Sequence, residues 1–76
     1  MTIQEWKEKY IPKREAKKVL ETAGVYHCVL TNWIKHGVHP NILGIIYISK
    51  AIHKLYGHDY RTVVTEGILA AGKKDE

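Results

Sequence analysis

The sequence predicts an all-α domain of about five short helices in a chain of 76 residues. Apolar residues recur at the three-and-four spacing of an amphipathic helix in successive segments. Glycine or proline residues separate these segments, and several segments begin with a residue type that caps helices. We therefore expect a single domain over residues 1–72, followed by a short charged tail at residues 73–76.

The first helix is predicted to begin directly after Thr2. Thr2 and Glu5 have the spacing of a capping box, in which each side chain accepts a hydrogen bond from the other residue's backbone N–H group. The residues that follow at helical spacing form an apolar stripe of Ile3, Trp6 and Tyr10.

The second helix is predicted between Pro12 and Gly24. Proline is tolerated in the first turn of a helix, where its missing N–H group has no partner in any case. Gly24 can take the left-handed conformation that ends a helix. The apolar stripe of this second helix consists of Ala16, Val19, Leu20 and Ala23.

The third helix is predicted over residues 26–36 and lies in the most informative part of the chain. Val25 follows the glycine that ends the second helix and places an apolar anchor in the bend. Gly37 is expected to end the third helix. Its apolar face, again at three-and-four spacing, consists of Val29, Leu30, Trp33 and Ile34.

The fourth helix is predicted from about Ile42 to Tyr56, with Asn41 as a possible N-cap and Gly57 after its end. Its isoleucine-rich first half could form a strand on propensity alone. The helical spacing continues without a break into the second half, which favours a helix. The residues expected to line its buried side are Ile42, Ile45, Ile48, Ile52 and Leu55.

A fifth helix is predicted from Asp59, which can cap its first turn, to Gly72. The brief connections between all these helices complete the all-α pattern. The apolar stripe of the fifth helix is expected to consist of Tyr60, Val63, Val64, Gly67, Ile68 and Ala71.

The outer face of the third helix carries a short row of polar side chains. They are mostly uncharged and rich in hydrogen-bonding groups, whereas a merely solvated helix face usually carries Glu and Lys. Such a row suits DNA base edges and phosphates, although an ordinary polar face is the alternative. The row consists of Tyr26, His27, Cys28, Thr31, Asn32 and Lys35.

The charge distribution favours an anionic partner near this row. The formal net charge is +4 and the pI is near 9.3, and no Asp or Glu occurs from Thr22 through His58. Glu15 and Glu21 lie upstream and could form helical ion pairs with the neighbouring cations. Those cations are Lys13, Arg14, Lys17 and Lys18.

Metal, cofactor and enzyme chemistry is not expected. The single cysteine, Cys28, excludes an intrachain disulfide and a Cys-rich zinc site. His36 and His39 are separated by the helix-ending Gly37, and no carboxylate lies nearby to complete a metal site. His27 and Cys28 are adjacent and should point in different directions, which argues against a nucleophilic pair.

The chain is expected to act in the cytoplasm, without a membrane or a small-molecule substrate as partner. The longest apolar stretch, Ile42 to Ile48, is too short to span a bilayer. Polar Gln4 and Glu5 lie where a signal peptide needs its apolar region.

The segment from Gly24 to Gly37 resembles the lambda-repressor-like DNA-binding domains, and within them the small phage Cro regulators. The last two predicted helices look more like those of all-helical repressors than like Cro proteins that end in a β-hairpin. The resemblance implies a helix-turn-helix formed by the second and third helices. It is carried by Gly24-Val25-Tyr26, polar His27, apolar Leu30 and the ending Ile34-Lys35-His36-Gly37.

The resemblance also implies roles for individual residues. Asn32 could pair with adenine and His27 could donate to guanine. Where the family often has Gln opening the supporting helix, this chain has Ala16, so other residues must contact the phosphates. The base-reading candidates are Tyr26, His27, Cys28, Thr31 and Asn32, and the backbone-contacting candidates are Lys13, Arg14, Lys17 and Lys35.

A homodimer is expected for two reasons. The core of so short a chain is small, and a second subunit would cover more apolar surface. Reading a palindromic operator also requires two recognition helices about 34–36 Å apart. The residues expected at the interface are Leu43, Ile46, Tyr47, Val64 and Ile68.

The sequence therefore predicts a phage or prophage transcriptional regulator that binds double-stranded DNA as a dimer. Two alternatives stay open. One is an excisionase-like or architectural protein that bends DNA. The other is an antitoxin or other protein-interaction module, whose isoleucine-rich fourth helix would bind the partner.

Overall fold

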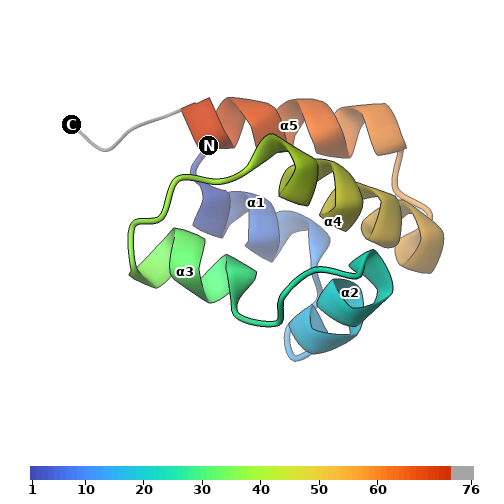
Figure 1. Cartoon of the computed structure of the whole chain (residues 1–76). Coiled ribbons are helices and arrows are strands. Elements are labelled where there is room, and N and C mark those ends of the chain that lie inside the picture. The colour runs from blue at the N-terminus through green and yellow to red at the C-terminus, as the bar shows by residue number, and fades with distance from the viewer. Residues whose placement is uncertain (73–76) are drawn as a thin grey trace.

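The computed structural model describes residues 1–72 and confirms the predicted all-α fold (Figure 1). No strand occurs in this part of the chain. The tail predicted at residues 73–76 lies outside the described residues. The helices are α1 (Ile3–Tyr10), α2 (Ala16–Ala23), α3 (Val29–Lys35), α4 (Ile42–Tyr56) and α5 (Tyr60–Gly72).

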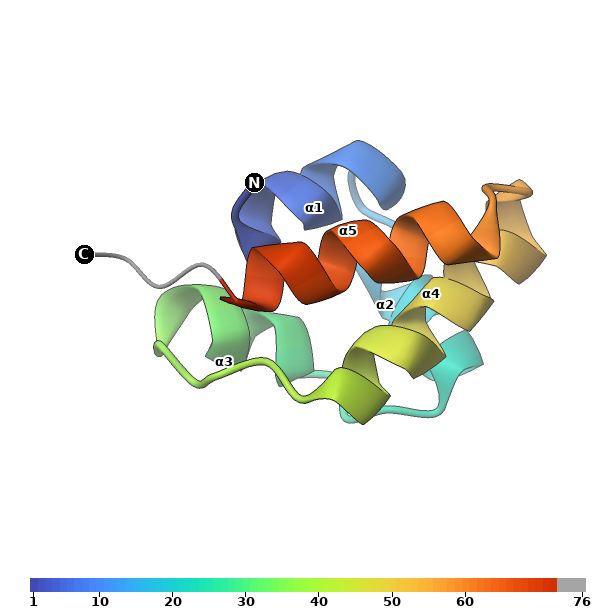
Figure 2. The ribbon, with the colours of Figure 1, turned by 90° about the horizontal axis from the view of Figure 1, so that it is seen from above.

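Trp6 lies in the core and joins α1 to α5. Its side chain is 0% exposed, and its indole Nε1–H donates a hydrogen bond to the Val63 carbonyl at 3.0 Å. Gly67 allows α5 to approach closely, because a Cβ there would lie 2.6 Å from Ile45 Cγ2. As a result, α5 packs against both α1 and α4 and lies between them when the molecule is seen from above (Figure 2).

The buried side of α4 faces α2 and α5. One predicted core residue is wrong, because Ile42 is 59% exposed. Ile42 shares the helical face of buried Ser49, but as the first residue of the helix its side chain is left exposed. The buried residues of α4 are Ile45, Ile48, Ser49, Ala51 and Ile52.

The side chains expected to cap three helices do so. The Thr2 hydroxyl and the Glu5 carboxylate form the predicted capping box. The Asn41 side chain caps α4, and the Asp59 carboxylate accepts two hydrogen bonds from Thr62 in the first turn of α5. Local hydrogen-bonding chemistry therefore sets where these helices begin.

The expected start of α2 at Pro12 is wrong, because the helix begins at Ala16. Ile11 is extended, as the residue before a proline tends to be, and is 4% exposed. A separate turn follows, in which the Glu15 N–H donates to the Pro12 carbonyl at 3.0 Å. Arg14 in this turn has a φ of 74°, which is incompatible with a continuous helix.

The prediction that Ile68 belongs to the buried apolar stripe of α5 is wrong, because Ile68 is 41% exposed. Small residues, including Ala70, lie on the buried side instead, and they permit the close approach of α5 to α1 and α4.

None of the helices in residues 1–72 is long and apolar enough to cross a membrane.

Candidate nucleic-acid interface

The connection between α2 and α3 begins with a left-handed glycine, as predicted. Gly24 has a φ of 73°, and its N–H donates to the Glu21 carbonyl at 3.1 Å. The Val25 N–H donates to the Leu20 carbonyl at 3.2 Å, so the last turn of α2 is closed as in a Schellman motif. Val25 is partly buried against the core and anchors the bend.

α3 is shorter than the predicted 26–36, because it extends from Val29 to Lys35. The Val29 N–H donates to the Tyr26 carbonyl at 3.0 Å, three residues back, whereas an α-helix uses the carbonyl four residues back. Tyr26, His27 and Cys28 therefore lie in a turn before the helix, and His36 follows its last residue.

Two buried residues attach α3 to the rest of the molecule. Leu30 is 3% exposed and Trp33 is 7% exposed. The Trp33 ring lies against the backbone of α4 at Gly44, where an added Cβ would come within 2.9 Å of its Cη2 atom. Sequence reasoning missed this contact because nothing in the local pattern around Gly44 indicates its partner.

The polar row predicted for this helix lies at the surface. Tyr26, His27, Thr31 and Lys35 are exposed, while Cys28 and Asn32 are half-buried. The Tyr26 and His27 rings contact each other at 4.7 Å between centroids. Within residues 1–72, no side chain of the row forms a hydrogen bond or an ion pair. Their polar groups are therefore free to bind a ligand.

Part of the row lines an open hollow of about 560 Å³ between α1, α2 and α3. His27, Thr31 and Lys35 contribute from one side, and Lys17 contributes from α2. Lys7 of α1 also lines the hollow, which sequence reasoning missed because only the packing of α1 beside α3 brings it there. The hollow therefore combines hydrogen-bonding groups with cations from three helices and with one carboxylate, that of Glu8.

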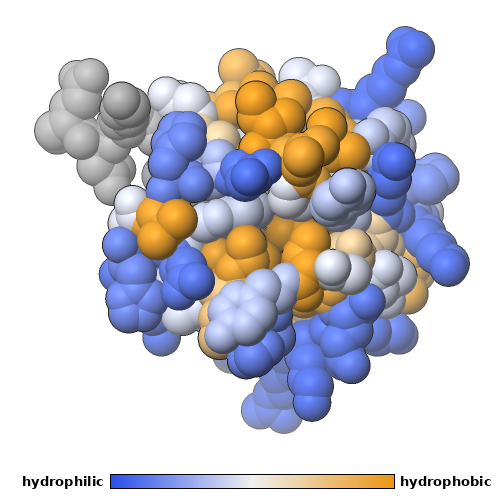
Figure 3. Space-filling view, in the orientation of Figure 1, coloured by the Kyte–Doolittle hydropathy of each residue, from blue (hydrophilic) through white to orange (hydrophobic). Residues whose placement is uncertain are grey.

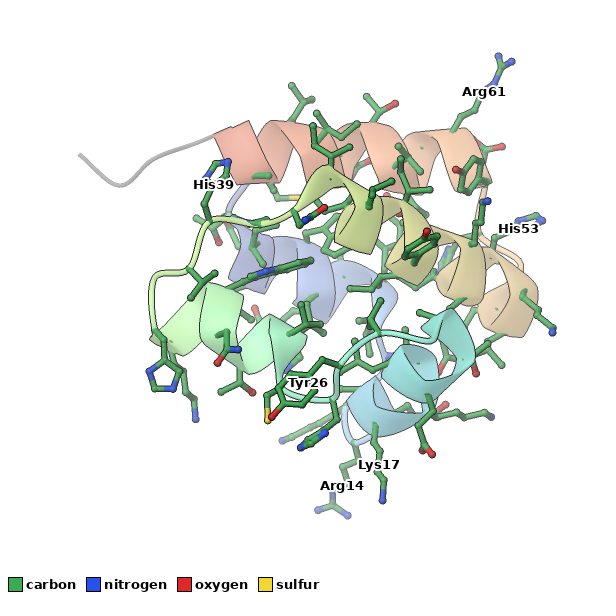
Figure 4. All side chains as sticks on the ribbon, in the orientation of Figure 1. Arg14, Lys17, Tyr26, His39, His53 and Arg61 are labelled. Carbon is green, nitrogen blue, oxygen red and sulfur yellow. The ribbon has the colours of Figure 1, made fainter. Side chains whose placement is uncertain are left out.

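The predicted backbone-contacting cations are unpaired. Lys13, Arg14, Lys17 and Lys35 form no ion pair with any carboxylate of residues 1–72. By contrast, Lys9 pairs with Glu66 at 2.8 Å and Lys18 lies 4.0 Å from Glu15. Arg14 and Lys17 project from the same end of the molecule, below Tyr26 in Figure 4. That end therefore presents unneutralised positive charge.

Glu15 is the acidic residue closest in sequence to these cations, and its carboxylate is held by α4. The Tyr56 hydroxyl donates a hydrogen bond to Glu15 Oε1 at 2.6 Å. Burial and this hydrogen bond raise the pKa of Tyr56 to about 12, so the hydroxyl stays protonated as a donor at neutral pH.

Exposed apolar side chains gather over α4 and α5, in the upper half of Figure 3, while the surface over α2 is hydrophilic. Of the predicted interface residues, Leu43, Tyr47 and Ile68 are exposed, and Ile46 and Val64 are half-buried. Ile42 and Leu69, which were not predicted there, are 59% and 64% exposed. We call Ile42, Leu43, Tyr47, Ile68 and Leu69 the apolar face.

No group of three His, Cys, Asp or Glu side chains within residues 1–72 could hold a metal ion. No protein-family model, curated protein or solved structure matches the chain.

Proposed function

We propose that this chain is a sequence-specific DNA-binding transcriptional regulator of the phage Cro or repressor type, acting in the cytoplasm. In this proposal α2 and α3 form a helix-turn-helix that places α3 in the major groove. One observation carries the proposal: unbonded polar side chains and unpaired cations lie together around the α2–α3 connection.

Base recognition would come from side chains in the turn before α3 and on its outer face. The exposed His27 and Thr31 lie four residues apart, and the half-buried Asn32 has an amide that can pair with adenine. Each good base contact contributes roughly 1–3 kcal/mol of discrimination. Lys17 and Lys35 at the rim of the hollow would contact phosphates, which adds affinity without sequence preference.

The apolar face supports a homodimer. It lies over α4 and α5 in the upper half of the view and faces the viewer, whereas Arg14 and Lys17 project from the lower end (Figures 3 and 4). A twofold axis along this face would bury it in both copies and leave both basic ends on the same side. Two α3 helices about 34–36 Å apart could then read successive major grooves of a palindromic operator.

Two substitutions on α3 test base reading. Asn32→Ala should cost about 1–3 kcal/mol on a selected operator and little on unrelated duplex. Lys35→Gln should weaken binding to both duplexes alike and reduce the slope of log K against log salt concentration by about one. Arg61→Gln, which removes a positive charge far from Arg14, is the matched control. Fluorescence anisotropy titrations give these quantities, and an equal loss on all sequences from Asn32→Ala would contradict base reading.

The apolar face also favours a second candidate, a protein-interaction module such as an antitoxin. Its exposed side chains on α4 and α5 could bind a different protein. A stable heterologous complex, together with no retention of duplex at low salt, would favour this candidate. Strong bending in circular-permutation gel shifts would instead indicate an architectural protein.

A further inference from the structure

Arg14 has an unfavourable backbone conformation for its residue type. It is the third residue of the turn from Pro12 to Glu15, and it is the only non-glycine residue of those described with positive φ, at 74°. Glycine or asparagine normally takes this position in such a turn, because a Cβ atom is disfavoured there. Backbone strain of this kind persists only where surrounding contacts impose it.

Contacts on both sides of the turn impose this conformation. Before it, Ile11 is fixed in the core at 4% exposure. After it, the backbone of Glu15 bonds to the Pro12 carbonyl, and the carboxylate of Glu15 accepts the Tyr56 hydrogen bond. Tyr56 is 41 residues away in sequence, at the end of α4, so the fold rather than the local sequence holds the turn.

The same hydrogen bond determines where the Glu15 charge lies. Glu15 is next to Arg14 in sequence and two residues before Lys17, so its free carboxylate could neutralise either cation or repel phosphate. While it bonds to Tyr56, the carboxylate is directed toward the end of α4 and lies 4.0 Å from the Lys18 ammonium group, whereas Arg14 and Lys17 project from the lower end of the molecule in Figure 4.

We propose that Tyr56 is a positioning residue for DNA binding, whose hydroxyl fixes the Glu15 carboxylate and thereby presents Arg14 to a phosphate. This role rests on the proposed DNA-binding function and deepens it. Tyr56 itself need not contact DNA. Arg14 would make the phosphate contact expected at the start of the supporting helix α2, because Ala16 there has no hydrogen-bonding side chain.

Four variants of the full chain test the proposal: Tyr56→Phe, Glu15→Gln, the double variant and Arg14→Gly. Binding to a fixed duplex is measured over a series of salt concentrations, at a temperature where thermal unfolding shows every variant folded. Tyr56→Phe should bind several-fold more weakly. Glu15→Gln keeps an acceptor for Tyr56 and loses the charge, so it should bind at least as tightly as wild type. In the Glu15→Gln background, Tyr56→Phe should have a smaller effect, because the released side chain is neutral.

Arg14→Gly separates strain from function. Glycine adopts this φ readily, so the Tm should not fall and could rise by about 4–8 °C if 1 kcal/mol of strain is released. DNA binding should nevertheless weaken, with the salt slope reduced by about one. Arg61→Gln, the control for loss of a positive charge, should leave both quantities unchanged.

Three results would overturn the proposal that Tyr56 positions Glu15 and thereby Arg14. They are wild-type binding by Tyr56→Phe, an equal loss of binding by Glu15→Gln, or a lowered Tm in Arg14→Gly. If the wild-type chain retains no duplex at low salt, both this role and the proposed function fail. If the wild type binds and Tyr56→Phe binds equally well, only the role of Tyr56 fails.

Discussion

α4 and α3 differ in nearly every feature that makes a helix form. α4 has 15 residues, a side-chain cap at Asn41 and a left-handed glycine, Gly57, after its last residue. α3 has 7 residues, and its N-cap residue, Cys28, forms no side-chain capping hydrogen bond. Because so short a helix is unstable in isolation, α3 depends on the packing of Leu30 and Trp33.

The two helices also differ in whether their polar side chains are left free to bind a ligand. Two polar residues at the start and in the middle of α4 are used within the fold, where Asn41 caps the helix and Ser49 bonds to the Ile45 carbonyl at 2.7 Å. The polar side chains of α3, including Thr31 and Asn32, form no hydrogen bond within residues 1–72. A helix that keeps its polar groups available for a ligand must obtain its stability from its neighbours.

The largest effect is expected from Gly44→Ala, which breaks the contact between the two helices. The new Cβ would lie 2.9 Å from Trp33 Cη2, so the indole or the helix must move. Overpacking of this kind costs about 1–3 kcal/mol of unfolding free energy, measured in urea. DNA binding should weaken as well, because Trp33 anchors α3. Gly72→Ala, with open space around its Cβ, is the control. Wild-type stability and binding in Gly44→Ala would contradict the dependence of α3 on α4.

A smaller effect is expected from replacing the glycine that follows each of two helices. Gly24 after α2 and Gly57 after α4 have φ values of 73° and 75°, with nothing within 4 Å of an added Cβ. Alanine at either position should therefore cost a similar amount, about 1–2 kcal/mol in thermal or urea unfolding. Only Gly24→Ala should also weaken DNA binding, because it changes the approach to α3. Equal binding by the two variants would show that the connection does not set the position of α3.

The sequence predicted most of α4 correctly and less of α3, for physical reasons. Helix ends at Asn41 and Gly57 depend on local hydrogen bonding and backbone conformation, which residue type indicates directly. At Tyr26 to Cys28, the choice between an α-helix and a tighter turn depends on how the Gly24 bend places the chain. The exposure of Ile42 depends on which neighbours reach the first turn of α4, and helical spacing alone does not specify this.

The candidate site shows the same division. The spacing of side chains on one helix predicted that Thr31 and Lys35 face outward. The pairing of Trp33 with Gly44, and of Tyr56 with Glu15, joins residues distant in sequence, so it required the folded arrangement. Lys7 was missed for the same reason.

The smallest effect is expected from the ion pair between Lys9 of α1 and Glu66 of α5, which does not involve α3. The hydrogen bond from Lys9 holds the pKa of the Glu66 carboxyl below its usual value of 4.5. A carboxyl whose pKa is lowered in the folded state stabilises the fold fully at pH values above its usual pKa. This stabilisation is lost as the pH falls through the lowered pKa. The Tm difference between wild type and Glu66→Gln should therefore be largest near neutral pH and shrink in acid. An unchanged difference would contradict this assignment.

We propose above all that the surface around α3 reads DNA in a homodimer. Selection of bound sequences from a random pool of DNA duplexes, followed by sequencing, tests it most directly. We expect a palindromic consensus whose half-sites are about 10–10.5 base pairs apart from centre to centre. Recovery of no enriched sequence, or of one without twofold symmetry, would contradict the claim.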